Sequence, residues 1–180
     1  TSLVFDFNAK GRSNYSTDKD VWKYKDYTGT FKGFKWNAAS GWVNNALLLD
    51  KDSEFSVDIA PLADDSTVLG KTIEFEFTTR NVEDDNAVVC NLTNNGVGIL
   101  ITASEARITS SAGEVLSTRF KAGEINRIGF VIQRKTGANY KGLVFIYVNG
   151  IISGAINYGT ADNFISSSFV HGTHRSACRR

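Results

Sequence analysis

Hydrophobic and polar residues alternate along most of the chain with the two-residue period of a β-strand. The segment 71–80 shows the pattern most clearly, with Ile73, Phe75 and Phe77 at the apolar positions and Glu74, Glu76, Thr78 and Arg80 at the polar ones. Successive side chains of a strand point to opposite faces, so this period predicts one buried and one solvated face. We expect the charged face to continue onto a neighbouring strand, with Arg127 and Gln133 beside the glutamates and Phe130 in the core.

Turn residues divide the rest of the chain into further short strands. The segment 143–148 is apolar on both faces, as in a central strand. It runs into Asn149-Gly150, a strong hairpin signal because both residues accept positive φ, so 151–158 should return antiparallel. The other predicted strands are 3–8, 46–49, 55–59, 87–92, 98–102, 106–110, 114–120 and 127–133. Many short strands with regular turns predict an all-β sandwich or barrel.

Charge and hydropathy exclude several classes of function. The 180 residues suit one domain, and 20 basic against 19 acidic side chains give a net charge of +1. No basic stripe is present, so nucleic acid is not an expected partner. No apolar run approaches the ~18–20 residues that a membrane-spanning helix needs, so membrane insertion is not expected. Nucleotide-binding and metalloprotease motifs are absent, and we expect no cofactor.

Several segments together resemble a known family. They are Phe5-Asp6-Phe7, Phe34-Lys35-Trp36-Asn37, Gly41-Trp42, Gly98-Ile99-Leu100-Ile101-Thr102, Tyr147-Val148-Asn149-Gly150 and the stretch 70–89. Over about residues 3–165 the chain is similar to the laminin-G-like, concanavalin A-like modules of bacteriophage tail, fibre and other virion proteins. The resemblance implies a jelly-roll β-sandwich of two antiparallel sheets and a place on a virion or an extracellular or cell surface. It says little about activity, because this sandwich carries lectins, glycosidases, lyases and structural domains.

The end of the chain departs from the family pattern. Residues 171–180 hold two histidines, three arginines and little alternation, where the family has a regular last strand. We therefore expect a sandwich over 1–170 and an irregular tail over 171–180, truncated or foreign. A missing last strand would leave the edge beside residues 3–8 open, and an open edge favours an oligomer.

The histidines and cysteines give no strong metal or disulfide signal. His171, His174 and Cys178 have donor types that suit zinc, but no fourth ligand is evident, so no metal is expected. We expect Cys90 to be a core thiol and Cys178 a tail thiol. A disulfide between them is the alternative.

Glu74, Glu76 and Arg80 form the one arrangement that resembles a catalytic site. Glycosidases of the concanavalin A-like class need two carboxylates on such a strand, four or five positions apart, but position 78 is Thr78. Phe120-Lys121-Ala122-Gly123 echoes an alginate-lyase segment without the other motifs of that class. We expect no catalytic residue and a solvated face that can contact a polar ligand. The candidate ligand-binding residues are Glu74, Glu76, Arg80, Arg127, Gln133, Tyr147, Trp22 and Tyr24.

Aromatic residues gather in the loop-rich stretch between 20 and 42. An exposed indole ring can stack on a sugar, but tryptophan also fills the space between sheets. Trp36 and Trp42 are expected in the core, whereas Trp22 and Tyr24 are open between core and ligand contact.

Two classes of function remain. The preferred one is a non-catalytic structural or adhesion module of a phage virion or surface protein, which binds a host-cell polysaccharide and contacts other virion or surface chains. The alternative is a carbohydrate-active enzyme, a glycoside hydrolase or polysaccharide lyase, with an atypical site.

Overall fold

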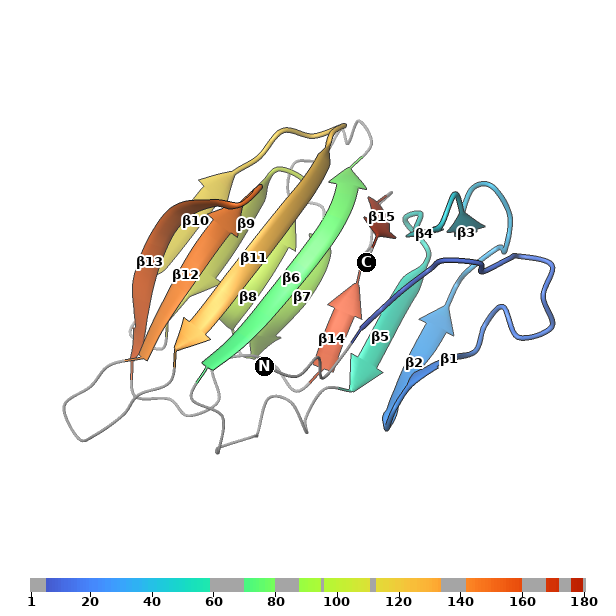
Figure 1. Cartoon of the computed structure of the whole chain (residues 1–180), viewed down its shortest axis with the longest axis horizontal. Coiled ribbons are helices and arrows are strands. Elements are labelled where there is room, and N and C mark those ends of the chain that lie inside the picture. The colour runs from blue at the N-terminus through green and yellow to red at the C-terminus, as the bar shows by residue number, and fades with distance from the viewer. Residues whose placement is uncertain are drawn as a thin grey trace.

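Two antiparallel sheets packed face to face make up the chain in its computed structural model (Figure 1). The structure describes residues 6–58, 70–79, 88–94, 96–110, 113–133, 142–159, 168–171 and 176–179. The predicted all-β jelly-roll sandwich is confirmed. Within these ranges no helix has the length and apolar character needed to cross a membrane.

Among the described residues, one sheet has eight strands and the other has seven. In spatial order, the eight-stranded sheet consists of β1 (Trp22–Tyr24), β2 (Tyr27–Lys32), β5 (Glu54–Asp58), β14 (Ser168–His171), β7 (Val88–Asn94), β8 (Val97–Thr102), β9 (Glu105–Thr109) and β10 (Val115–Arg119). The seven-stranded sheet consists of β13 (Ile151–Gly159), β12 (Gly142–Val148), β11 (Ile125–Gln133), β6 (Gly70–Thr79), β15 (Ser176–Arg179), β4 (Ala46–Leu48) and β3 (Gly41–Val43). In Figure 1, β13, β12, β11 and β6 lie in front of β10, β9, β8 and β7.

The seven-stranded sheet is the front sheet and the eight-stranded sheet is the rear sheet. The alternation of apolar and polar residues in the sequence predicts the register of the front sheet. Arg127 lies opposite Glu76, and Phe75 lies opposite Ile128. Directly opposed residues share a face, so the glutamates point outward and the phenylalanines inward. The predicted register is therefore confirmed for the described residues, with Phe130 fully buried.

Inward-facing side chains of both sheets form one hydrophobic core. The front sheet contributes Phe77, Phe130 and Ile146, and the rear sheet contributes Leu92 and Ile99, among others. Burial of each such side chain contributes about 1.5–3 kcal/mol. Cys90 also belongs to this core, as predicted, with only 1% of its surface exposed.

The prediction of an irregular tail over 171–180 is wrong for its described residues. β14 pairs with β5 and β7, and β15 pairs with β6 and β4, so the chain end enters the interior of each sheet. Strand pairing is made by backbone groups, which need partners whatever side chains they carry. The weak alternation of apolar and polar residues in 171–180 therefore does not exclude a strand there. The segment 20–42, expected to be loop-rich, likewise contains β1, β2 and the first two residues of β3.

The sequence predicts an open sheet edge beside a strand over residues 3–8. No described strand contains any of these residues. Residues 6–8, the described part of that predicted strand, are not in a sheet. The edges of the described sheets are β1, β10, β13 and β3.

Candidate functional site

The outer face of the front sheet brings together most of the predicted ligand-binding residues. Glu74 and Glu76 lie on β6, Arg127 on β11 and Tyr147 on β12. Gly129 lies opposite Glu74 on one side and opposite Tyr147 on the other. One row of side chains therefore crosses three neighbouring strands on the face turned away from the core.

Arg127 is the centre of this face. Its Nε lies 3.3 Å from Glu74 Oε1, and its Nη2 lies 3.0 Å from Glu76 Oε2. The side chains of Arg127 and Glu74 are 54% and 55% exposed, and that of Glu76 is 24% exposed. Exposed ion pairs contribute only about 0.2–1 kcal/mol each. Their main effect is to hold a cation and two carboxylates in one arrangement open to solvent.

The turn of the β12–β13 hairpin holds the backbone of Arg127 in place. Asn149 has φ 50° and Gly150 has φ 82°, as the predicted Asn-Gly turn requires. The Arg127 N–H donates to Asn149 Oδ1 at 2.8 Å, and the Asn149 N–H donates to the Arg127 carbonyl at 2.8 Å. Asn149, which the sequence predicts as a turn residue, thus also fixes the backbone of Arg127.

This arrangement can bind a polar molecule that carries hydroxyl groups. The carboxylates accept hydrogen bonds, the guanidinium donates them, and the half-buried Tyr147 offers an aromatic surface beside them. Thr78 lies opposite Ile125 at the position where a second catalytic glutamate would stand. The described residues of this face therefore resemble a binding surface more than a catalytic pair.

The other predicted site residues lie elsewhere or outside the described ranges. Gln133 is exposed at the far end of β11, opposite Leu143 and on the same face. Tyr24 lies on the rear sheet, half-buried, with Lys25 Nζ 5.4 Å from its ring centroid. Arg80 lies outside the described residues.

Trp22 is a core residue, so its assignment as a ligand contact is wrong. It is 3% exposed, and its ring meets that of Phe55 edge to face at 5.8 Å. The strand β1 turns Trp22 inward and Lys23 outward, a local alternation that three residues are too few to reveal in sequence. Trp42 is buried and Trp36 packs against the core half-buried, as expected for both.

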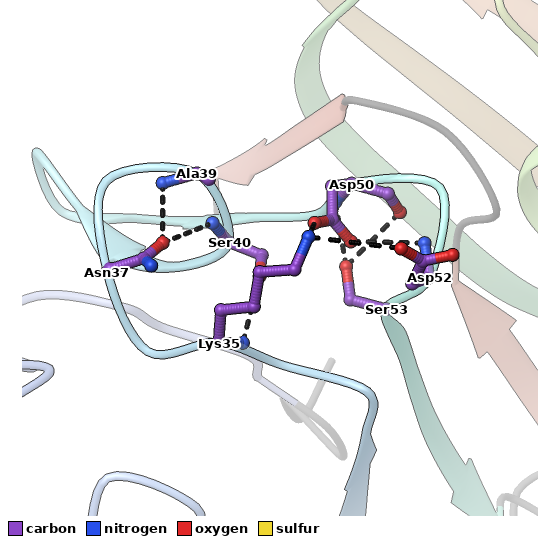
Figure 2. Close-up of polar contacts among 7 residues, drawn as sticks. All are labelled: Lys35, Asn37, Ala39, Ser40, Asp50, Asp52 and Ser53. Atoms are coloured by element: carbon purple, nitrogen blue, oxygen red, sulfur yellow. Dashed lines mark hydrogen bonds and ion pairs between the residues drawn. The ribbon is translucent and has the colours of Figure 1, made fainter.

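A second polar cluster lies in two loops between β2 and β5 (Figure 2). Lys35 Nζ donates to Asp50 Oδ2 at 2.7 Å, the Asp52 N–H donates to Asp50 Oδ1 at 3.1 Å, and the Asp50 N–H donates to Ser53 Oγ at 2.7 Å. Burial of Asp50 raises its pKa, but the hydrogen bonds from Lys35, Asp52 and Ser53 outweigh burial and leave the pKa below its ordinary value.

The Lys35–Asp50 ion pair ties the two loops together, and further hydrogen bonds form within the first loop. The Lys35 N–H donates to Ser40 Oγ at 3.0 Å, and Asn37 Oδ1 accepts from the Ala39 N–H at 2.8 Å. These polar groups bind one another, which is the pattern of a structural brace. No group of three His, Cys, Asp or Glu side chains suited to a metal ion occurs in the part of the chain that the structure describes.

Comparison with known proteins supports the fold alone. No protein-family model matches the chain, and no curated protein matches its sequence. The binding domain of botulinum neurotoxin DC in complex with SialylT is 13% identical with a TM-score of 0.55, covering 92% of this chain and 46% of that one. A structure described as HCR/D-Sa-GBL1/C is 13% identical with a TM-score of 0.54, covering 84% of this chain and 42% of that one.

The chain thus spans less than half the length of these two proteins. A fungal endo-β-1,4-glucuronan lyase from Trichoderma reesei is 12% identical with a TM-score of 0.46, covering 97% of this chain and 88% of that one. This last similarity is too distant to carry an argument. What the comparisons support is a jelly-roll sandwich, a fold that serves several functions.

Proposed function

We propose that this chain is a non-catalytic structural or adhesion module that binds a host-cell glycan on the outer face of the front sheet. The observation that supports it is the contact of Arg127 with Glu74 and Glu76 beside Tyr147 on an exposed face. Binding sites for small polar molecules combine a few fixed donors and acceptors with aromatic surface. A sugar ring matches both, because it has hydroxyl groups at its rim and apolar C–H groups on its faces.

The absence of catalysis is part of the proposal. Glycosidases need a proton donor and a second carboxylate at a set spacing across the scissile bond. Here one guanidinium binds both glutamates, and Thr78 stands four positions after Glu74. The alternative of a hydrolase or lyase with an atypical site is tested below.

The proposed location is a virion or another extracellular surface. Its support is the resemblance of segments such as Tyr147-Val148-Asn149-Gly150 to phage virion modules. Other chains of the same particle would then be its structural partners. Mass spectrometry of virions purified from a phage that encodes this chain should detect it, and its absence from the particles would contradict the location.

A glycan array with the full chain tests the binding function. Wild-type protein should bind at least one class of cell-surface polysaccharide, and Arg127→Ala should lose at least tenfold in affinity. Arg107→Ala is the matched control, because Arg107 forms an ion pair with Glu105 on the rear sheet. Equal losses in the two variants, or no binding by the wild type, would contradict the proposal.

An activity panel separates binding from catalysis. Polysaccharides that bind the chain should release neither reducing ends nor unsaturated sugars. Release that Glu74→Gln abolishes would establish the enzyme alternative instead.

A further inference from the structure

Gly129 occupies a position where the fold does not need a glycine. It lies in the middle of β11, and its φ is outside the left-handed region. A Cβ built there would have one described neighbour within 4 Å, Tyr147 Cβ at 3.7 Å, which is ordinary van der Waals contact. By contrast, Gly33 has φ +73°, and a Cβ there would lie 2.0 Å from the Asp52 carbonyl oxygen.

A glycine of this kind weakens its strand. It loses more conformational freedom on folding than any other residue and gives its neighbours no side chain to pack against. Glycine within a strand often marks a place where a ligand or another backbone approaches closely. Since neither backbone geometry nor the described neighbours account for Gly129, close approach of a ligand or of another backbone is the remaining physical reason, and the polar groups around Gly129 favour a ligand.

The surroundings of Gly129 suit one face of a sugar ring. Glu74 and Tyr147 flank it across the sheet, and Arg127 and Val131 are the next residues on the same face of β11. The missing side chain leaves a gap in this row, with the Arg127–Glu74 ion pair at one border and the tyrosine at another.

We propose that the gap at Gly129 is a subsite for one pyranose ring of a neutral oligosaccharide. The ring lies over the Gly129 backbone with its apolar face against Tyr147, and its hydroxyl groups bind Glu74 and Arg127. The subsite rests on the proposed glycan-binding function and assigns it a position and a class of sugar.

The described charged side chains around the gap favour neutral sugars. Among the described side chains, two carboxylates surround one guanidinium, and Arg127 already contacts both of them at 3.3 and 3.0 Å. The carboxylate of a uronate or sialic acid would face Glu74 and would compete with it for Arg127. Unfavourable like-charge contacts of this kind are a common source of specificity. Neutral hexoses and N-acetylhexosamines avoid that cost.

Filling the gap tests the subsite without removing any contact of the fold. Gly129→Val adds a β-branched side chain that suits a strand, so its melting temperature should equal or exceed that of the wild type. Its affinity should fall at least tenfold, and Gly129→Ala should show a smaller loss. Ser117→Val is the control, since it places the same valine side chain at an exposed position of β10 in the rear sheet.

The probe is an array of cello-, manno-, xylo- and chito-oligosaccharides beside alginate, polygalacturonate and sialyllactose. Neutral oligosaccharides should bind the wild type and not Gly129→Val. Wild-type binding that survives in Gly129→Val overturns the subsite and leaves the proposed function standing. A wild type that binds no glycan overturns the proposed function itself, and tighter binding of the acidic probes overturns the assignment of neutral sugars.

Two further outcomes decide the remaining alternatives. If Gly129→Val does not fold, as judged by circular dichroism, then Gly129→Ala decides in its place. If Gly129→Val keeps glycan binding but lowers the sedimentation coefficient of an oligomer, the gap belongs to a contact between protein chains and the subsite is wrong.

Discussion

The side chain of Asn14 pairs with the backbone of Trp42 as a neighbouring strand would. The Trp42 N–H donates to Asn14 Oδ1 at 2.7 Å, and Asn14 Nδ2 donates to the Trp42 carbonyl at 3.1 Å. Gly41 makes the approach possible, because it has φ +145° and a Cβ there would lie 2.3 Å from Asn14 Oδ1. One side chain thereby attaches the loop before β1 to the edge strand β3.

Asn14→Ala should destabilise the chain by about 1–3 kcal/mol, because it leaves two half-buried backbone groups of Trp42 without their partners. Urea unfolding measures the change. Tyr15→Ala is the control, since Tyr15 is 97% exposed and its replacement should change stability by less than about 0.5 kcal/mol. Similar values for the two variants would show that the pairing contributes little.

Asp50 should make stability depend on acid pH. Its pKa in the folded chain is lowered, so it stabilises the fold above its unfolded pKa of about 3.9, and this contribution is lost as the pH falls through the lower folded value. The unfolding free energy of the wild type should therefore fall relative to that of Asp50→Asn below about pH 4. Denaturant titrations at several pH values measure this difference, and a constant difference from pH 7 to pH 2 would contradict it.

Trp22→Ala should destabilise the chain by about 3–5 kcal/mol, as expected for a large aromatic side chain removed from a core. The adjacent Val21 is 47% exposed, and Val21→Ala should cost less than about 0.5 kcal/mol. Thermal or chemical unfolding of both variants tests the assignment. A small effect of Trp22→Ala accompanied by lost glycan binding would restore it as a ligand contact.

Gly33→Ala should destabilise the chain more than Gly113→Ala. Both glycines have positive φ, which costs an alanine about 1–2 kcal/mol. At Gly33 the new Cβ would also meet the Asp52 carbonyl at 2.0 Å, whereas at Gly113 no described atom lies within 4 Å. Equal unfolding free energies for the two variants would show that the loop around Asp52 can move aside.

The candidate site was predictable in part from the sequence. Alternation placed Glu74 and Glu76 on one face with Arg127, and this grouping is what the strand pairing shows. The sequence placed two cations on this face, Arg80 of the same strand and Arg127 of another, without deciding which one the glutamates contact. The structure shows that Arg127 of β11 contacts both glutamates, while Arg80 lies outside the described residues. A contact between strands depends on which strands are neighbours, and alternation within one strand does not contain that information.

By itself the sequence determined the faces of the long strands and the Asn149-Gly150 hairpin, because the two-residue period and the positive φ of a turn are local properties of a few residues. Only the tertiary structure decided that β15 lies between β6 and β4, that Trp22 is buried, and that Asn14 pairs with Trp42. These features join residues far apart in the chain. The backbone groups and aromatic rings involved come into contact because the packed sheets bring distant parts of the chain together. No local pattern of side chains specifies which of these groups will be neighbours.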